Sequence, residues 1–406
     1  MNLLRFLLTL VLCAMAEYAF AEETGMTRAQ AYARAAALQA LGRKMFTDPS
    51  LSASGQMACA TCHDPKFAFG PPNARDVQLG GKDMTQPGLR AVPSLTYLQA
   101  VPQFTEHYYE SDDEGDASVD NGPTGGLTWD GRADRGREQA RIPLLSPYEM
   151  ANGDEAGVAA KIRRTSYVGE FAKIYGPEVL KDDGKTFAAA IEALEVFEQS
   201  EQEFYPYSSK YDAYLAGRAK LSEQEARGLA LFNDEEKGNC ASCHRSAVDN
   251  DGTPPQFTDY GLIAIGLPRN MNIPANADPN YFDLGACGPL RTDLANDPEY
   301  CGLFRTPSLR NVALRQTFYH NGVEHDLRKA VEFYVERDTK PEKWYPRNAD
   351  GTVAKFNDLP RSYWDNVNME PPFGGKPGDL PRLSPSEIDD IVAFLATLTD
   401  GYRPVR

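Results

Sequence analysis

Cys59-Ala60-Thr61-Cys62-His63 is followed 181 residues later by Cys240-Ala241-Ser242-Cys243-His244, so the chain carries the pattern C-x-x-C-H twice. In this pattern the two thiols bond covalently to the vinyl groups of a c-type haem, and the histidine becomes the proximal ligand of its iron. A zinc site or a thiol–disulfide pair is the alternative, but neither requires a histidine directly behind the second cysteine. The pattern therefore predicts two covalent haem c groups, with His63 and His244 as iron ligands.

Similar segments precede the two haem strings, which indicates an internal repeat. Residues 41–48 precede the first string and residues 227–234 precede the second, and each segment closes an amphipathic helix. The expected fold is mostly α, with two tandem cytochrome c-like haem domains and long connecting loops. The expected boundaries are 22–212 for the N-terminal haem domain and 213–406 for the C-terminal haem domain.

Helix signals support this fold class. Helices are expected over 27–46 and 186–200, where apolar residues recur at helical spacing. Ser222 with Glu225, and Ser384 with Glu387, form capping boxes for two later helices. The last helix carries its apolar side chains on one face: Ile388, Ile391, Phe394, Leu395 and Leu398. The long Gly- and Pro-rich connections are expected at 64–93, 103–127, 249–303 and 338–383, and loops of this length need a stabilising group such as haem inside the fold.

The N-terminus and the composition restrict location and partners. Residues 1–21 have the features of a cleaved secretory signal: a positive start at Arg5, an apolar stretch and the site Ala19-Phe20-Ala21. No later run is apolar and long enough to span a membrane. The predicted location is the periplasm, where c-type haems are attached. The formal net charge of −16 argues against nucleic acid as a partner.

The seven cysteines divide into three groups. Cys13 belongs to the predicted signal, and four cysteines belong to the haem strings. Cys287 and Cys301 remain, and an oxidising compartment favours a disulfide between them over two free thiols. A bridge that closes this short loop would contribute roughly 3 kcal/mol to stability.

Further segments resemble the family of bacterial di-haem cytochrome c peroxidases and MauG. In the C-terminal half these segments are 306–314, 318–322 and 330–334, and in the N-terminal half they are 127–133, 138–140 and 147–150. With both haem strings, the resemblance covers nearly all of the chain after the signal. It implies an enzyme that uses hydrogen peroxide together with a partner protein in the periplasm.

The resemblance implies four site residues around the first haem. Glu149 corresponds to the distal acid–base glutamate, which moves a proton between the two peroxide oxygens. Gln139 corresponds to the neighbouring distal glutamine, Pro143 to a proline that lines the pocket, and Trp129 to the tryptophan between the haems. From the residues alone, Glu149 could equally be a solvated loop carboxylate, and Trp129 a buried core aromatic.

Tyr334 stands where the peroxidases carry a methionine ligand to the second haem, and MauG-like members carry tyrosine there. A thioether raises the potential of a haem, whereas a phenolate is a hard anionic donor that stabilises oxidised iron. The resemblance therefore favours the MauG-like subtype with a tyrosine-ligated second haem. The alternative is that Tyr334 only packs on its helix, and that Met271 or Met369 is the ligand.

The remaining histidines bear on whether the first haem is open. In many peroxidases a histidine closes this haem at rest, but the corresponding segment 85–90 contains none, so an open face is expected. His107 lies in an acidic insert, 106–120, and is expected near the surface or the edge of the pocket. His320 falls in a family motif where packing or a propionate contact is expected, and His325 is a further candidate ligand.

Two features of the family are altered. Its inter-haem calcium binds an asparagine side chain and two backbone carbonyls, and these positions correspond to Tyr97, Arg315 and Thr317. Calcium is therefore a possible but doubtful cofactor. The tryptophan that MauG uses as a relay to its protein substrate corresponds to Gly238. Trp344 and Trp364 are the alternative exit residues, or ordinary core residues.

Three functions follow, in order of preference. The first is MauG-like: peroxide reacts at the N-terminal haem, and oxidising equivalents pass through the second haem to a residue, such as tryptophan, on a partner protein. Some relatives are thought to convert tryptophan to kynurenine in copper-handling partners. The second is a cytochrome c peroxidase that removes hydrogen peroxide with electrons from a small cytochrome or cupredoxin. The third is a di-haem electron carrier that is not an enzyme.

Overall fold

The computed structural model describes residues 26–109 and 119–403. The predicted signal over 1–21, with Cys13, lies outside these residues, as does the part 110–118 of the acidic insert. None of the described helices is both long enough and apolar enough to cross a membrane.

The N-terminal half contains α2 (Arg28–Phe46), η2 (Pro49–Leu51), α3 (Cys59–Cys62), η3 (Pro65–Phe67), β1 (Leu79–Gly80), β2 (Gln86–Pro87), α4 (Gly136–Leu145), α5 (Glu155–Ile162), α6 (Val168–Tyr175), η4 (Pro177–Lys181), α7 (Asp183–Glu198) and α8 (Glu201–Phe204). The C-terminal half contains α9 (Lys210–Leu215), α10 (Glu223–Asn233), η5 (Cys240–Ser242), β3 (Leu262–Ile263), η6 (Pro274–Ala277), η7 (Pro298–Tyr300), β4 (Phe304–Arg305), η8 (Val312–Leu314), α11 (Leu327–Glu336), α12 (Pro341–Trp344), η9 (Arg361–Asn366) and α13 (Pro385–Ala396).

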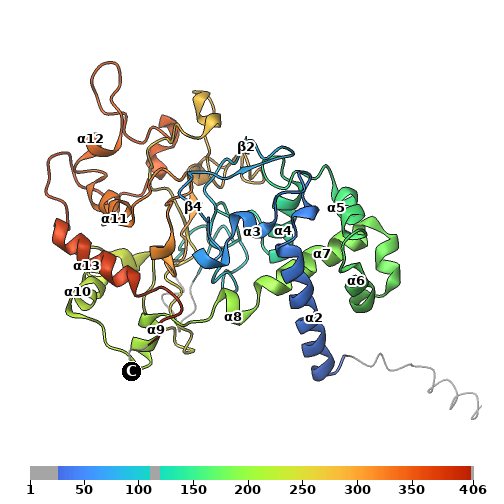
Figure 1. Ribbon diagram of the computed structural model, residues 1–406. Coiled ribbons are helices and arrows are strands. Elements are labelled where there is room, and N and C mark those ends of the chain that lie inside the picture. Colours follow the sequence, from blue (N-terminus) through green and yellow to red (C-terminus); the bar gives the residue numbers. More distant parts are fainter. Residues whose placement is uncertain (1–25, 110–118, 404–406) are drawn as a thin grey trace, which may run out of the picture.

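The helices gather at the two ends of the molecule, and loops fill the space between them. Helices α2 and α4 to α7 lie at one end, and α9, α10, α11 and α13 lie at the other (Figure 1). Within the described residues, the strands form two antiparallel pairs, β1 with β2 and β3 with β4. The predicted fold class, mostly α with long connections, is confirmed.

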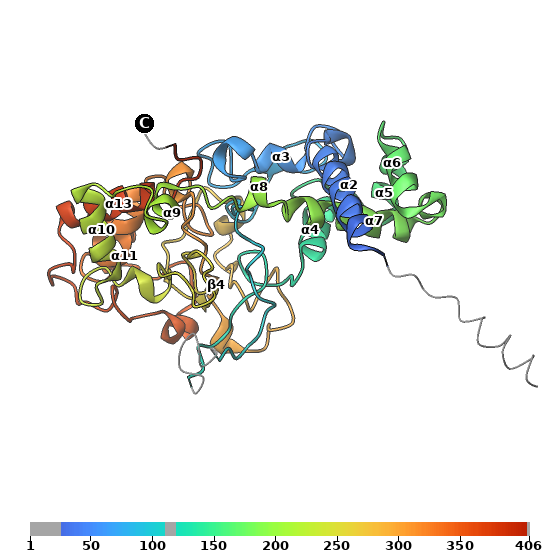
Figure 2. The same ribbon diagram turned by 90° about the horizontal axis from the view of Figure 1, so that it is seen from below.

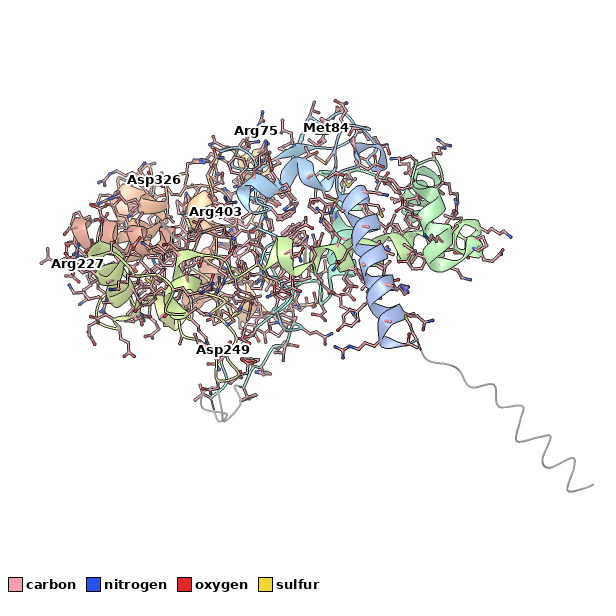
Figure 3. All side chains as sticks on the ribbon, turned by 60° about the horizontal axis from the view of Figure 1, so that its bottom comes forward. Arg75, Met84, Arg227, Asp249, Asp326 and Arg403 are labelled. Atoms are coloured by element: carbon pink, nitrogen blue, oxygen red, sulfur yellow. A yellow bond between two sulfur atoms is a disulfide. The ribbon has the colours of Figure 1, made fainter. Side chains whose placement is uncertain are left out.

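Each half is built around one close helix crossing. Helix α2 crosses α7 at Gly42, where a Cβ atom would lie 2.0 Å from the carbonyl oxygen of Ala193. Helix α10 crosses α13 at Gly228, where a Cβ atom would lie 2.0 Å from the carbonyl oxygen of Asp390. Arg227, next to this glycine, lies at the outer end of the C-terminal half, far from Met84 of the N-terminal half (Figure 3). The repeat seen in the haem strings is therefore also a repeat of helix packing.

The helix signals of the sequence correspond to real helix starts. The capping boxes at Ser222 with Glu225 and at Ser384 with Glu387 are both formed. These caps satisfy backbone N–H groups that have no partner inside the helix. The apolar residues named for the last helix are all at most 3% exposed. A disulfide joins Cys287 and Cys301, as the sequence predicts for an oxidising compartment.

The two halves interlock rather than stand side by side. Figure 2 shows the teal segment near residues 119–130 running beside the C-terminal half. Within it, the backbone N–H of Gly125 donates to the carbonyl of Tyr260 at 2.9 Å. In return, Arg291 donates to the carbonyl of Asp130 at 2.9 Å. A segment of the first predicted domain therefore packs on the second half, and the boundary at 212 remains a prediction.

Candidate haem sites and the cavity between them

Both haem strings hold their histidine in the same way. The cysteines sit on the short helix α3 in the first string, and at η5 in the second. Nδ1 of His63 lies 2.9 Å from the carbonyl oxygen of Phe69, and Nδ1 of His244 lies 2.9 Å from that of Phe257. Nδ1–H donates in each pair, which leaves Nε2 as the metal-binding nitrogen. This arrangement is the one that a proximal haem ligand needs.

A short repeat in the sequence orients these two carbonyls. Phe69 and Phe257 both have positive φ angles, 53° and 55°. The hydroxyl of Ser94 donates to the carbonyl of the residue before Phe69 at 2.8 Å, and that of Ser308 donates to the carbonyl of the residue before Phe257 at 2.6 Å. Each serine lies in a Pro-Ser-Leu segment, at 93–95 and 307–309. The sequence reasoning missed these supporting residues, although the repeated tripeptide was the signal for them.

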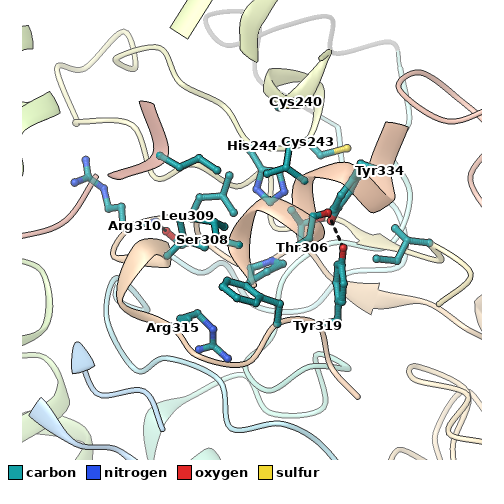
Figure 4. A pocket seen from close by; sticks show the side chains of 18 of the residues that line it. Cys240, Cys243, His244, Thr306, Ser308, Leu309, Arg310, Arg315, Tyr319 and Tyr334 are labelled. Atoms are coloured by element: carbon teal, nitrogen blue, oxygen red, sulfur yellow. Dashed lines mark hydrogen bonds between the residues drawn. The ribbon is translucent and has the colours of Figure 1, made fainter. Parts of the chain in front are cut away.

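A large cavity adjoins the second haem string. Cys240, Cys243 and His244 line it, as do Trp129 and Tyr334. Figure 4 shows His244 and Tyr334 both reaching into this space near the two cysteines. Most of the remaining lining is apolar, which suits the faces of a porphyrin.

Two polar side chains of this cavity, one without a hydrogen-bond partner and one without a charge partner among the described residues, fit a bound haem. The hydroxyl of Tyr260 is buried without a hydrogen-bond partner among the described residues. The guanidinium of Arg305 donates from Nε to the carbonyl of Thr128 at 3.2 Å. Burial lowers the pKa of Arg305 to about 10, because no carboxylate offsets the loss of water. A haem propionate would supply the missing acceptor and the missing negative charge, so the residues present fit the group.

Tyr334 is the candidate ligand that lies at the second haem site. It is half-buried on α11, and its ring stacks on Phe373 with centroids 5.3 Å apart. Burial raises its pKa, and the neighbouring Cys243 and Cys240 add to this shift. The two alternative ligands are Met271 and Met369, and neither lines the cavity. Their side chains are exposed instead, Met271 by 65% and Met369 by 46%.

Glu149 faces the first haem string. Burial raises the pKa of the Cys62 thiol to about 12, and the negative charge of Glu149 contributes to the shift. Burial also raises the pKa of Glu149 itself, while the charge of Arg132 and a hydrogen bond from Ser146 oppose the increase. The backbone at Glu149 is held by β1, since a Cβ on Gly80 would lie 2.9 Å from the Cα of Glu149. A carboxyl group with a raised pKa close to a haem edge can accept and return a proton.

Helix α4 supplies Gln139 and Pro143 on one face, since they are four residues apart. Pro143 has no N–H, so it cannot donate to the carbonyl of Gln139 within the helix. The backbone N–H of Met150 donates to the carbonyl of Pro143 at 3.0 Å. This bond folds the loop that carries Glu149 back onto the helix that carries Gln139.

Trp129 is held rigidly between the halves. Its Nε1 donates to the carbonyl of Ala91 at 2.8 Å, and the backbone N–H of Ala91 donates to the carbonyl of His320 at 2.7 Å. The backbone N–H of Arg305 donates to the carbonyl of Trp129 at 2.7 Å. The indole therefore reaches the cavity with its N–H already engaged, and only its ring is available for contact with a haem.

The three histidines outside the haem strings have other partners. His107 is exposed and pairs with Asp120 at 2.6 Å. His325 pairs with Asp76 at 3.0 Å and is also partly exposed. His320 lines the cavity but stacks on Phe304, with ring centroids 3.4 Å apart. Burial lowers the pKa of His320 to about 3, so its ring is neutral.

The side chains at the positions expected to bind calcium make other contacts. Tyr97 offers no carboxamide, and its hydroxyl donates to Asp400 at 2.9 Å. The carbonyl of Thr317 accepts a hydrogen bond at 3.1 Å from the guanidinium of Arg315. No cluster of three or more acidic, histidine or cysteine side chains that could hold a metal occurs within 26–109 and 119–403. The carbonyl of Thr317 is thus in contact with the cationic side chain of Arg315, and calcium at Arg315 and Thr317 stays a prediction.

Comparison with known proteins identifies the family. Methylamine utilization protein MauG of Paracoccus denitrificans is 35% identical over 382 residues, which cover 91% of this chain and 90% of that protein. The chain belongs to the di-haem cytochrome c peroxidase and MauG family. The family model described as di-haem cytochrome c peroxidase matches residues 36–220.

Solved structures of this family have the same fold. The di-haem peroxidase BthA of Burkholderia thailandensis is 41% identical with a TM-score of 0.78, over 89% of this chain and 86% of that one. A MauG-like protein associated with microbial copper homeostasis is 26% identical with a TM-score of 0.61, over 90% and 89%. As a di-haem peroxidase/MauG family member, the chain is a hydrogen-peroxide-dependent oxidoreductase with two haem groups.

Proposed function

We propose that this enzyme reduces hydrogen peroxide at its N-terminal haem and passes the oxidising equivalents, through the second haem, to a partner protein. The modified group on that partner is a side chain such as tryptophan, as in MauG-like chemistry. The reaction is assigned to the periplasm, in agreement with the predicted signal over 1–21. When bound, the haems supply the redox-active iron that the chain itself lacks.

The observation that carries this proposal is the position of Tyr334. Its phenol reaches the cavity that His244, Cys240 and Cys243 also line, while both candidate methionines are exposed elsewhere. An oxygen donor stabilises oxidised iron, whereas a thioether would favour the reduced state. A tyrosine-ligated second haem suits an enzyme that stores oxidising equivalents rather than one that feeds electrons to the first haem.

The residues at the first haem have separate tasks in this proposal. The carboxylate of Glu149 takes a proton from one peroxide oxygen and returns it to the other, so that the leaving group departs as water. Gln139 lies on the helix tied to this loop and orients the peroxide by a hydrogen bond. Burial raises the pKa of Glu149, and the positive charge of Arg132 opposes this rise and so favours the ionised carboxylate.

Trp129 and Trp344 are the proposed path for the oxidising equivalents. Trp129 lines the cavity from the N-terminal half and provides the aromatic ring between the haem sites. On the far side, the ring of Phe333 lies 6.3 Å from that of Tyr334 and 5.4 Å from that of Trp344. Trp364 instead packs on Phe356, 5.7 Å away, so it is the weaker candidate for the exit.

A peroxide-scavenging enzyme is the second candidate. The support for it is that BthA, at 41% identity, is described as a di-haem peroxidase. In this case a small cytochrome or cupredoxin would supply electrons, and the second haem would be reduced first. A pure electron carrier is the third possibility, and it would require two six-coordinate haems that do not react with peroxide.

Spectroscopy of Tyr334 variants tests the proposal. The resting protein should show one high-spin ferric haem by electron paramagnetic resonance, and peroxide should give a long-lived oxidised state. Tyr334→Phe should abolish that state, and Tyr334→Met should convert the enzyme to one whose second haem has a raised potential. Tyr345→Phe is the matched control, since Tyr345 is buried nearby and its hydroxyl donates to Gly266 outside the cavity lining.

Three outcomes would reject the MauG-like assignment. The first is a Tyr334→Phe protein with unchanged spectra and an unchanged oxidised state. The second is rapid turnover of reduced cytochrome c by the unaltered protein together with a high-potential second haem, which would favour the scavenger. The third is the absence of any peroxide-dependent mass change in proteins that co-purify with the enzyme.

A further inference from the structure

Arg315 is a charged side chain placed where the two haem sites approach each other, and no carboxylate of residues 26–109 or 119–403 pairs with it. Its Nε donates to the carbonyl of Thr317 at 3.1 Å, and its Nη2 donates to the carbonyl of Val92 at 3.0 Å. Burial is the single cause that lowers its pKa, to about 10, so no acidic group among the described residues offsets the loss of water. A guanidinium with this pKa remains charged at neutral pH.

The side chain of Arg315 joins the two halves of the molecule. Val92 lies 223 residues before Arg315 in the chain and belongs to the N-terminal half. A Cβ on Gly70, directly after the carbonyl that holds His63, would lie 3.6 Å from Nη1 of Arg315. The same side chain lines the cavity of the second haem, where Figure 4 shows it at a distance from Cys240 and Cys243. Arg315 therefore adjoins both haem sites.

The hydrogen bonds of Arg315 are of the kind that a bound cation makes. Both acceptors are backbone carbonyl oxygens, which are ligands that calcium prefers. One of them, Thr317, belongs to the pair of carbonyls that corresponds to the family's calcium ligands. The third calcium-binding position, Tyr97, has its hydroxyl turned to Asp400, so a metal ion would lack that donor.

We propose that the guanidinium of Arg315 is the resident cation between the two haems of this enzyme, in place of calcium. Its single fixed positive charge binds the carbonyls of Val92 and Thr317 and so fastens the N-terminal half to the C-terminal half. A guanidinium has five N–H donors, and two of them are used by these carbonyls. The remaining donors are available to haem carboxylates, which would balance its charge.

A cation that belongs to a side chain differs from a bound metal ion in two ways. It cannot be removed by a chelator, and its occupancy does not depend on the calcium concentration of the compartment. A positive charge near both haems also stabilises their reduced states, because reduction adds an electron to each iron. Loss of the charge should therefore lower the midpoint potentials of both haems together.

Metal analysis of the haem-loaded, unaltered protein is the first test. We expect no stoichiometric calcium after desalting, and no change in haem spectra, melting temperature or peroxide reactivity after treatment with EDTA. One calcium ion per chain, removed by EDTA with a change in the haem spectra, would overturn the proposal. This measurement does not depend on whether any variant folds.

Charge variants of the same protein are the second test. Arg315→Gln should lower both midpoint potentials and the melting temperature, whereas Arg315→Lys, which keeps the charge, should leave the potentials close to those of the unaltered protein. Arg328→Gln is the matched control, since Arg328 is a partly exposed arginine on α11 that pairs with Asp389. Unchanged potentials in Arg315→Gln, or an equal decrease in Arg315→Lys, would overturn the proposal. Both tests rest on the presence of two haems and not on the identity of the protein partner.

Discussion

Nδ1 of His244 lies 2.9 Å from the carbonyl oxygen of Phe257, and this bond fixes which ring nitrogen faces the haem. A hydrogen bond from Nδ1–H makes the other nitrogen a stronger donor to iron. His63 has the same relationship to Phe69 in the N-terminal half. The two proximal histidines are therefore held alike, and the proposed difference between the haems lies in their distal residues, Glu149 and Tyr334.

Ser308 and Ser94 donate to the carbonyls of the residues directly before Phe257 and Phe69, and these bonds provide a paired prediction. Removal of the hydroxyl in Ser308→Ala should loosen the carbonyl of Phe257, weaken the hydrogen bond from His244 and raise the midpoint potential of the second haem alone. Ser94→Ala should do the same for the first haem alone. Ser94 Oγ also accepts from the backbone N–H of Thr96, and Ser308 Oγ from that of Arg310. Each change therefore removes at least two hydrogen bonds, so stability should fall by about 1–3 kcal/mol. Spectroelectrochemical titration of the two haems measures the potentials.

The two serine variants serve as controls for each other. Each should leave the potential of the opposite haem unchanged, because its hydroxyl reaches only its own half. Equal shifts of both haems in either variant would show that the serines act through global stability rather than through the proximal histidine.

Glu149→Gln should slow the reaction with hydrogen peroxide by about 10²- to 10⁴-fold, since an amide cannot transfer the proton. The resting haem spectra should stay as they are, because Glu149 is not expected to bind iron. The ionised carboxylate is the base, and burial raises its pKa. The rate of the unaltered enzyme should therefore decrease as the pH falls through a value above the ordinary 4.5 of a glutamate. Stopped-flow kinetics across a pH series measures both effects.

Glu155→Gln is the control for this change. Glu155 begins α5 and pairs with Arg141 at the surface, so its loss should leave the rate and the pH profile unaltered. A Glu149→Gln enzyme that keeps the rate and the pH dependence of the unaltered protein would exclude Glu149 as the acid–base group.

Glu198 provides a prediction about stability and pH. Burial, and then the charge of Glu195, raise its pKa from 4.5 to about 8, so the folded protein binds a proton that the unfolded chain releases. Stability is therefore lost as the pH rises from 4.5 through 8. Glu198→Gln should remove this loss and raise the free energy of unfolding by about 1–3 kcal/mol at pH 8. Urea unfolding of the haem-loaded protein at several pH values measures the difference.

The gain in Glu198→Gln should disappear toward pH 4.5, where the carboxyl is protonated in both states. Glu192→Gln is the comparison, because Glu192 lies on the same helix in a partly exposed ion pair with Arg34. Such a pair contributes at most about 1 kcal/mol, so its effect should be small. A gain in Glu198→Gln that is equal at pH 4.5 and pH 8 would contradict the assigned titration.

Local sequence was sufficient for the parts of this protein that depend on neighbouring residues. The haem strings are read from five consecutive residues, because covalent attachment and proximal ligation need no other segment. The helix starts at Ser222 and Ser384 were also predictable, since a capping box is formed by two residues three positions apart. The family resemblance then pointed to Glu149 and Tyr334, whose roles remain proposals.

The tertiary structure alone decided which distant residues share a site. The guanidinium of Arg315 meets the carbonyl of Val92 across 223 residues, and Tyr334 reaches the cavity of a histidine that lies in another element. Position along the chain indicated only the backbone carbonyl of Arg315 as a possible calcium ligand, and the path of its side chain became visible only in the fold. Such contacts have no local signature, since the long loops that create them lack a periodic pattern and take their course from packing.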